Sequence, residues 1–118
     1  MGNQLAESIL DRIVERFEEA LPLWQRLGLD YGRAETIEMA GVLFGKEGRP
    51  VDAVKLLAAS VNLRERTGIP HSAFEREYIG GVNDQLRATL GDERFDQIWS
   101  EGRALSTDDA ITLALSTA

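Results

Sequence analysis

Cysteine is absent from this 118-residue chain, and histidine occurs once. Without cysteine there can be no disulfide framework and no thiolate metal site, and a single histidine offers few nitrogen ligands. The chain also lacks an apolar run of about 20 residues, the length that spans a bilayer, and its N-terminus lacks the basic and apolar regions of a secretory signal. We therefore expect a cytoplasmic protein with no membrane segment and no metal.

The chain contains fewer basic than acidic residues. Thirteen lysines and arginines face 20 acidic residues, so the formal net charge is -7 and the pI is near 4.7. Nucleic-acid affinity comes largely from basic side chains that displace counterions, so we expect no direct contact with nucleic acid, and a helical DNA-binding domain is the weaker alternative. A chain of this length forms one domain, here residues 1–118, and can bury roughly two-thirds of its unfolded surface.

Apolar residues recur every three or four positions almost throughout, which is the period of an amphipathic helix. The first such stripe consists of Leu5, Ile9, Ile13, Phe17, Leu21 or Ala20, Trp24 and Leu27. Pro22 predicts a kink or a break within it. Further helices are predicted at about 32–46, at 50–67, from 72–75 to about 90, around 92–105, and from 106 onward. No segment alternates like a strand, so the sequence predicts an all-α protein with five to six helices.

Residues typical of helix ends separate these segments: Pro50, Gly68, Ser72 with Glu75, Gly91 with Asp92, and Ser106 with Asp109. Proline suits the first turn of a helix because its missing amide hydrogen has no partner there. Glycine favours the left-handed conformation that ends a helix. A serine followed three residues later by an acid predicts a capping box, in which each side chain accepts from the other residue's amide. Asp92 is predicted to cap the helix after Gly91.

The segment 40–63 carries Gly41, Phe44, Gly48, Ala53 and Leu57 at offsets typical of one tetratricopeptide unit. The spacing of Ala20, Trp24 and Leu27 recurs 33 positions later as Ala53, Leu57 and Ser60. This interval is close to the 34-residue period of tetratricopeptide arrays. We therefore expect a right-handed stack of antiparallel helix hairpins, which is tetratricopeptide-like.

Several runs also resemble the C-terminal helical tail of large bacterial transcription regulators. They are residues 56–65, Gly68, Pro70, residues 75–78, Leu86-Arg87, Leu90-Gly91, Phe95, and the block from Trp99 through residues 101–106 to Ala110. In that family a STAND-type ATPase module is joined to a tetratricopeptide-like array, often with a LuxR-type or SARP-type DNA-binding domain. The resemblance covers roughly the last two-thirds of the chain. It departs from the family at Gly80 and Gly81, where alanine-rich helix is usual, and at residues 57–61.

The resemblance implies a C-terminal fragment of a larger regulator and a non-catalytic protein-interaction or sensor role. The partner would be an effector protein or the regulator's own NTPase module. The chain has no glycine-rich loop followed by lysine and serine or threonine, so we expect no nucleotide cofactor. A small-ligand effector domain is the alternative, and it would need an apolar pocket with convergent polar groups.

The inner surface of a repeat array is built by the first helix of each unit. In this chain that face bears Glu35, Glu38, Val42 and Lys46, which are the predicted partner-binding residues. The alternative is that they form a solvated face. An unpaired N-terminal helix would expose an apolar stripe, which predicts a homodimer through that end.

Four kinds of residue leave alternatives open. His71 follows a proline and is predicted to be an exposed turn residue without a catalytic or ligand role, because such roles need an oriented partner. Gly80 and Gly81 indicate close packing or a bend, or else a site of ligand approach. Trp24 and Trp99 are core residues or contact residues. The carboxylates are predicted to be solvated, so we expect no enzyme.

Overall fold

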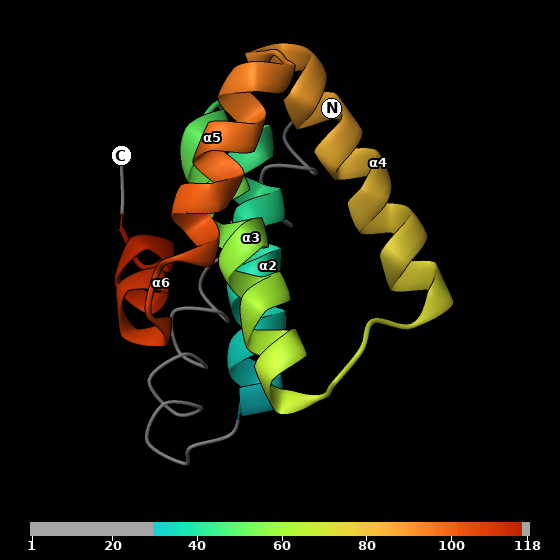
Figure 1. The fold of residues 1–118 in the computed structure, drawn as a ribbon, viewed down its shortest axis with the longest axis vertical. Helices are drawn as coiled ribbons and strands as arrows, with labels where there is room; N and C mark the ends of the chain where they lie inside the picture. Colours follow the sequence, from blue (N-terminus) through green and yellow to red (C-terminus); the bar gives the residue numbers. More distant parts are fainter. Residues whose placement is uncertain (1–29, 117–118) are drawn as a thin grey trace, which may run out of the picture.

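The computed structural model describes residues 30–116, which form five helices and no strand. Along the chain these are α2 (Asp30–Lys46), α3 (Pro50–Thr67), α4 (Ala73–Leu90), α5 (Asp92–Arg103) and α6 (Thr107–Ala114) (Figure 1). The all-α class and the stacking of helix hairpins are confirmed. The tetratricopeptide-like character and the right hand of the stack stay predictions. The predicted first helix, with Pro22 and Trp24, lies outside the described residues.

Helix ends follow the local signals closely. α3 begins at Pro50 and ends before Gly68, which has φ 71° and whose amide donates to the Arg64 carbonyl. Ser72 and Glu75 form the predicted reciprocal capping box at the start of α4. The prediction for Asp92 is wrong. Gly91 holds the cap position with φ 88°, and no side chain caps α5.

α2 and α3 form the central hairpin, and they lie side by side in Figure 1. The largest fully buried side chains belong to these two helices: Ile37, Val54, Leu56, Leu57 and Ser60. Gly41 permits their close approach, since a Cβ there would lie 3.0 Å from Leu57 Cγ and 3.2 Å from the Ala53 carbonyl oxygen. The hairpin therefore packs nearly backbone to backbone at this point.

α5 and α6 complete the body around α3. A Cβ on Gly102 of α5 would lie 2.5 Å from the Lys55 carbonyl oxygen and 2.8 Å from Ala58 Cβ, so only glycine fits between the two helices. On α6, Ala110 and Ile111 are buried against α2 and α3. The body consisting of α2, α3, α5 and α6 is thus closely packed.

α4 is arranged differently, because it meets the rest of the molecule along a narrow inner stripe. In Figure 1 the loop after α3 leads away from the body, and α4 then rises to the top of the view, where it joins α5, so that α4 and α5 form an open hairpin. Only Ile79 and Leu86 of α4 are buried. The predicted close packing at Gly80 and Gly81 is wrong for residues 30–116, since none of their atoms lies within 4 Å of a Cβ built at either glycine. The other described helices thus cover α4 along its inner stripe and leave its other sides open.

Candidate functional site

The four predicted partner-binding residues do not form one open face. Glu35 and Lys46 are exposed, whereas Glu38 and Val42 are buried. Val42 lines a small cavity of about 200 Å³ between α2 and α4, together with Lys46 and Leu86. Glu38 lies in a buried polar cluster. A single groove through all four residues is therefore not what the structure presents, and a role for the exposed pair in partner binding stays a prediction.

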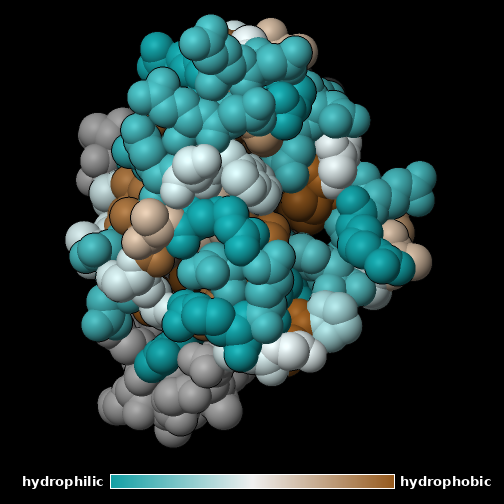
Figure 2. Space-filling view, in the orientation of Figure 1, coloured by the Kyte–Doolittle hydropathy of each residue, from teal (hydrophilic) through white to brown (hydrophobic). Residues whose placement is uncertain are grey.

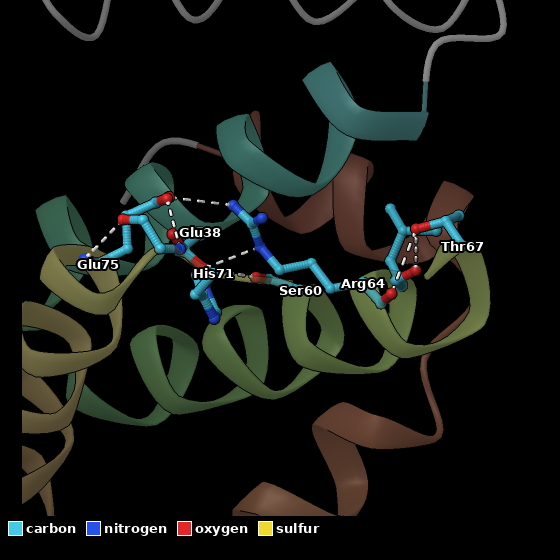
Figure 3. A network of polar contacts seen from close by, with 8 residues as sticks. Glu38, Ser60, Arg64, Thr67, His71 and Glu75 are labelled. Carbon is cyan, nitrogen blue, oxygen red and sulfur yellow. Dashed lines mark hydrogen bonds and ion pairs between the residues drawn. The ribbon is translucent and has the colours of Figure 1, made fainter. Parts of the chain in front are cut away.

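The polar cluster joins α2, α3, the α3–α4 loop and α4 (Figure 3). At its centre the Glu38 carboxylate accepts a hydrogen bond from Ser60 Oγ at 3.0 Å. The same carboxylate oxygen contacts His71 Nε2 and faces Arg64 Nε at 3.4 Å. Arg64 Nη2 faces Glu75 Oε2 at 3.5 Å. Because the side chains of Glu38 and Arg64 are each only 4% exposed, this is a buried ion pair with polar support.

Local sequence explains how these groups meet. Ser60 and Arg64 are four residues apart on α3, so they lie on one face of that helix. Glu75 is the third residue of α4, where the capping box directs its Oε1 to the Ser72 amide and leaves Oε2 for Arg64. Hydrogen bonds from the Ser72 amide and hydroxyl, followed by the charge of Arg64, lower the pKa of Glu75 below 4.5. The cluster therefore ties the start of α4 to the body.

The prediction that His71 is an exposed turn residue is wrong. Its side chain is 13% exposed and contacts Glu38, which lies 33 positions earlier in the chain. Pro70 and the loop bring it over α3, a placement that no local pattern indicates. Among residues 30–116, no group of three or more histidine and acidic side chains is arranged to hold a metal ion.

A second feature is the α4–α5 groove, a cavity of about 510 Å³ in the open hairpin. It is lined by Gly80, Asn83, Asp84 and Arg87 of α4 and by Phe95, Asp96 and Trp99 of α5. The Phe95 and Trp99 rings are stacked with centroids 5.7 Å apart. The Arg87 guanidinium lies 4.3 Å from the centre of the Phe95 ring and pairs with Asp92 at 3.3 Å and Asp96 at 3.1 Å. The groove thus combines aromatic and acidic groups.

A third feature is a pair of exposed aromatic side chains on α4. Phe74 is 77% exposed and Tyr78 is 44% exposed. They are four residues apart and so share a face of the helix. Residues 75, 79, 82 and 86 form the inward stripe, and Phe74 and Tyr78 each precede a member of it by one residue, about 100° around the helix. That offset is the signal in the sequence that indicates their exposure.

Apolar surface also lies in a recess next to the α3–α4 loop. The loop pocket, as we name it, has a volume of about 430 Å³ and is lined by Val61, Arg64, Glu65, Gly68, Ile69, Pro70 and His71. Figure 2 shows apolar atoms between the body and the lobe to its right, which is the first half of α4. Among the described residues, Arg64 Nε and Nη2 have no hydrogen-bond partner. Their ion-pair partners are Glu38 at 3.4 Å and Glu75 at 3.5 Å. The pocket and the polar cluster therefore share Arg64 and His71.

Comparisons with known proteins link the chain to regulators. It is similar to one segment each of three proteins named "Putative HTH-type transcriptional regulator", one from Mycobacterium bovis and two from strains of Mycobacterium tuberculosis. In each case 36% of 96 aligned residues are identical, which covers 80% of this chain and 11% of the relative. No protein-family model and no solved structure matches the chain.

The chain thus spans about a tenth of the length of the curated relatives that it matches. Their names agree with the predicted resemblance to bacterial transcription regulators, while the identification with the tail of a STAND-type ATPase stays a prediction. No helix among the described residues has the length and apolar character needed to cross a membrane. What the comparisons support is a segment related to much longer proteins that are named as transcriptional regulators.

Proposed function

We propose that this chain is a non-catalytic protein-binding module of a bacterial transcription regulator. The observation that carries the proposal is the surface of α4, which exposes Phe74 and Tyr78. The similarity to segments of proteins named as transcriptional regulators supports the setting. The partner is an effector protein or the regulator's own NTPase module.

The physical case rests on what this surface offers a partner. Aromatic side chains contribute large contact areas at protein interfaces, and tyrosine is enriched among residues that dominate binding energy. The buried polar cluster fixes the start of α4, just beside Phe74. A preorganised surface loses less entropy on binding than a flexible one. α4 is therefore suited to docking rather than to chemistry.

Site-specific photocrosslinking tests this proposal. A photoreactive phenylalanine analogue replaces Phe74 in the protein expressed in its source cells, and the adducts are identified by mass spectrometry. The matched control places the analogue at Thr112, an exposed residue of α6. We expect position 74 to yield one dominant protein adduct, or an adduct with another segment of the same polypeptide, that position 112 does not yield. No adduct at 74, or the same adducts at both positions, would contradict the proposal.

A reporter measurement connects the surface with regulation. In the full-length regulator, Phe74→Ser with Tyr78→Ser should change transcription from a target promoter, while Thr112→Ala should leave it unchanged. Circular dichroism melting of both variants checks that they remain folded. Unchanged transcription in a folded double variant would show that this surface has no regulatory role.

Binding of a small effector is the second candidate, and the loop pocket favours it. The pocket is lined by Val61, Ile69 and Pro70 and borders the buried Arg64. Its volume lies within the range of about 300–1,000 Å³ typical of ligand sites. A thermal-shift screen with metabolites tests this candidate: a true ligand raises the melting temperature of the native chain but not that of Val61→Phe, which fills the pocket.

Two further expectations remain proposals. One is self-association through the N-terminal helix, a segment that lies outside the described residues. A strict monomer in sedimentation velocity over a wide concentration range would contradict it. We also propose that the chain does not contact DNA directly, because its net charge is -7. Retardation of a duplex oligonucleotide in a gel at low salt would overturn that view.

A further inference from the structure

We propose that the α4–α5 groove binds an arginine side chain presented by a basic segment of the partner protein. The inference rests on the proposed function and names the chemistry of the partner. It is carried by the stacked rings of Phe95 and Trp99 beside the carboxylates of Asp84 and Asp96. No phosphate or other anion is expected in a groove with this lining.

The chain's own Arg87 shows that the groove accommodates a guanidinium. Its planar group lies over the Phe95 ring while two carboxylates, of Asp92 and Asp96, pair with its terminal nitrogens. Arginine combines stacking on an aromatic ring with directed pairing to carboxylates, whereas lysine acts as a compact point charge. The existing arrangement therefore favours arginine over lysine for a second, incoming cation.

Hydrogen-bond acceptors remain available for that second cation. Asp84 is exposed and makes no ion pair or hydrogen bond within residues 30–116. The side chain of Asp96 is 67% exposed although it pairs with Arg87. A donor-rich cation at Asp84 would give that carboxylate a partner, and the exposed Asp96 lines the same groove.

Space for the incoming chain comes from the glycine pair. Gly80 lines the groove, and a Cβ built at Gly80 or Gly81 would meet no atom of the described residues within 4 Å. A partner backbone can therefore approach α4 closely at this point. The alternative of ligand approach agrees with this geometry at Gly80, a residue that costs about 1 kcal/mol in a helix relative to alanine.

The charge of the chain indicates which kind of molecule can bind in the α4–α5 groove. Acidic side chains outnumber basic ones on both α4 and α5, and the whole chain carries a formal charge of -7. A second copy of the chain would bring the same charge and be repelled, and nucleic acid would be repelled for the same reason. A basic segment is attracted, and its association weakens with added salt because exposed charges are screened.

The test is an NMR titration of the purified chain with three neutralised-end amino acids as probes. These are acetyl-arginine methylamide, acetyl-lysine methylamide and acetyl-citrulline methylamide, which keeps the shape of arginine without its charge. We expect arginine to shift the Trp99 indole and Gly80 amide signals in a saturable way. Lysine keeps the charge but lacks the planar group, so it should bind about threefold more weakly, which is the scale of one exposed contact between a cation and an aromatic ring. Citrulline should give no saturable shift.

Variants locate the site. Asp84→Asn should weaken arginine binding about threefold without changing the melting temperature, because Asp84 makes no hydrogen bond or ion pair with the described residues. Glu77→Gln, an exposed acid of α4 outside the groove lining, is the matched control and should leave binding unchanged. Equal binding of arginine and citrulline, equal weakening by both variants, or the same shifts from a DNA duplex would overturn the inference.

This outcome is separable from that of the proposed function. If the Phe74 crosslinks appear while arginine fails to shift Trp99, the chain binds protein through α4 but not by the groove chemistry inferred here. If arginine binds while position 74 gives no adduct, the groove is supported and the docking role of the Phe74 surface is contradicted.

Discussion

Helices α3 and α4 have the same length of 18 residues, yet nine residues of α3 are buried and only two of α4. α3 packs against each of the other four described helices, whereas α4 meets them along one stripe. Apolar burial is the main source of stability in folding. α3 therefore holds the fold together, whereas α4 lies at its surface and contributes little to the core.

The two helices are also joined to the rest of the molecule by different chemistry. α3 is held by apolar contacts and by the close approaches at Gly41 and Gly102. α4 depends at its start on the polar cluster around Glu38 and Arg64, and further along on Ile79 and Leu86. Elements with few buried apolar contacts open at lower free energy than the core. We therefore expect α4 to open at lower free energy than α3.

The largest effect is expected at Arg64. Arg64→Met leaves the buried Glu38 carboxylate without its cationic partner, and loss of one member of a buried pair typically costs about 3–5 kcal/mol. Adding Glu38→Gln to Arg64→Met removes the stranded charge and should restore part of that loss. Urea unfolding followed by circular dichroism measures Arg64→Met, Glu38→Gln and the double variant. A double variant as unstable as the sum of the two single variants would contradict a coupled pair.

The next largest change in stability is expected at two glycines, of which Gly102 is tightly packed and Gly81 is not. Gly102→Ala places a methyl group against the backbone of Lys55 and should lower the free energy of unfolding by about 2 kcal/mol, as overpacking does. Gly81→Ala meets open space and should raise it by up to about 1 kcal/mol, because alanine is the better helix former. The same urea experiment applies. Equal changes of one sign would show that α5 is no more tightly packed than α4.

A smaller effect is expected from acid. The pKa of Glu75 is lower in the folded chain than its ordinary value of 4.5, so this carboxylate stabilises the fold above that pH and the contribution disappears as the pH falls through the folded-state pKa. The start of α4 should therefore fray as the pH falls below about 4.5, which NMR of the Ser72 and Glu75 amides can follow. Glu75→Gln should make these signals insensitive to pH in this range. An unchanged titration in that variant would assign the effect to another group.

Removal of the serine of the same capping box isolates its hydrogen bond. Ser72→Ala leaves the Glu75 amide without its acceptor and should cost about 1 kcal/mol, as loss of a helix cap generally does. Ser106→Ala is the matched change at the start of α6, where the hydroxyl accepts from the Asp109 amide. Thermal melts of both variants at pH 7 make the comparison. A loss at Ser106 with none at Ser72 would mean that α4 does not depend on its cap.

Local chemistry predicted most helix boundaries. Pro50, Gly68 and the Ser72–Glu75 box act within one turn of the chain, so their effects can be recognised without knowledge of the fold. Asp92 shows the limit of this approach, since a glycine before it took the cap position and Asp92 pairs with Arg87 instead.

The polar cluster and the groove are harder to predict from the sequence than the helix ends, because they depend on contacts between residues far apart in the chain. Helical periodicity places Glu38 on an open face. In the structure it is enclosed by Ser60, Arg64 and His71, which lie 22 to 33 positions later in the chain. The close approach at Gly102 depends on which helix lies opposite, and periodicity within one helix cannot indicate that. Gly80 and Gly81 could be recognised as unusual from the sequence, but only the open hairpin shows that they face free space.

Native-state hydrogen exchange measures whether α4 is held less firmly than the body organised around α3. We expect amides of α4 between Ile79 and Leu86 to exchange through a partial opening at clearly lower free energy than amides of α3 between Val54 and Leu63. Exchange of both helices at the same free energy, through global unfolding alone, would contradict it.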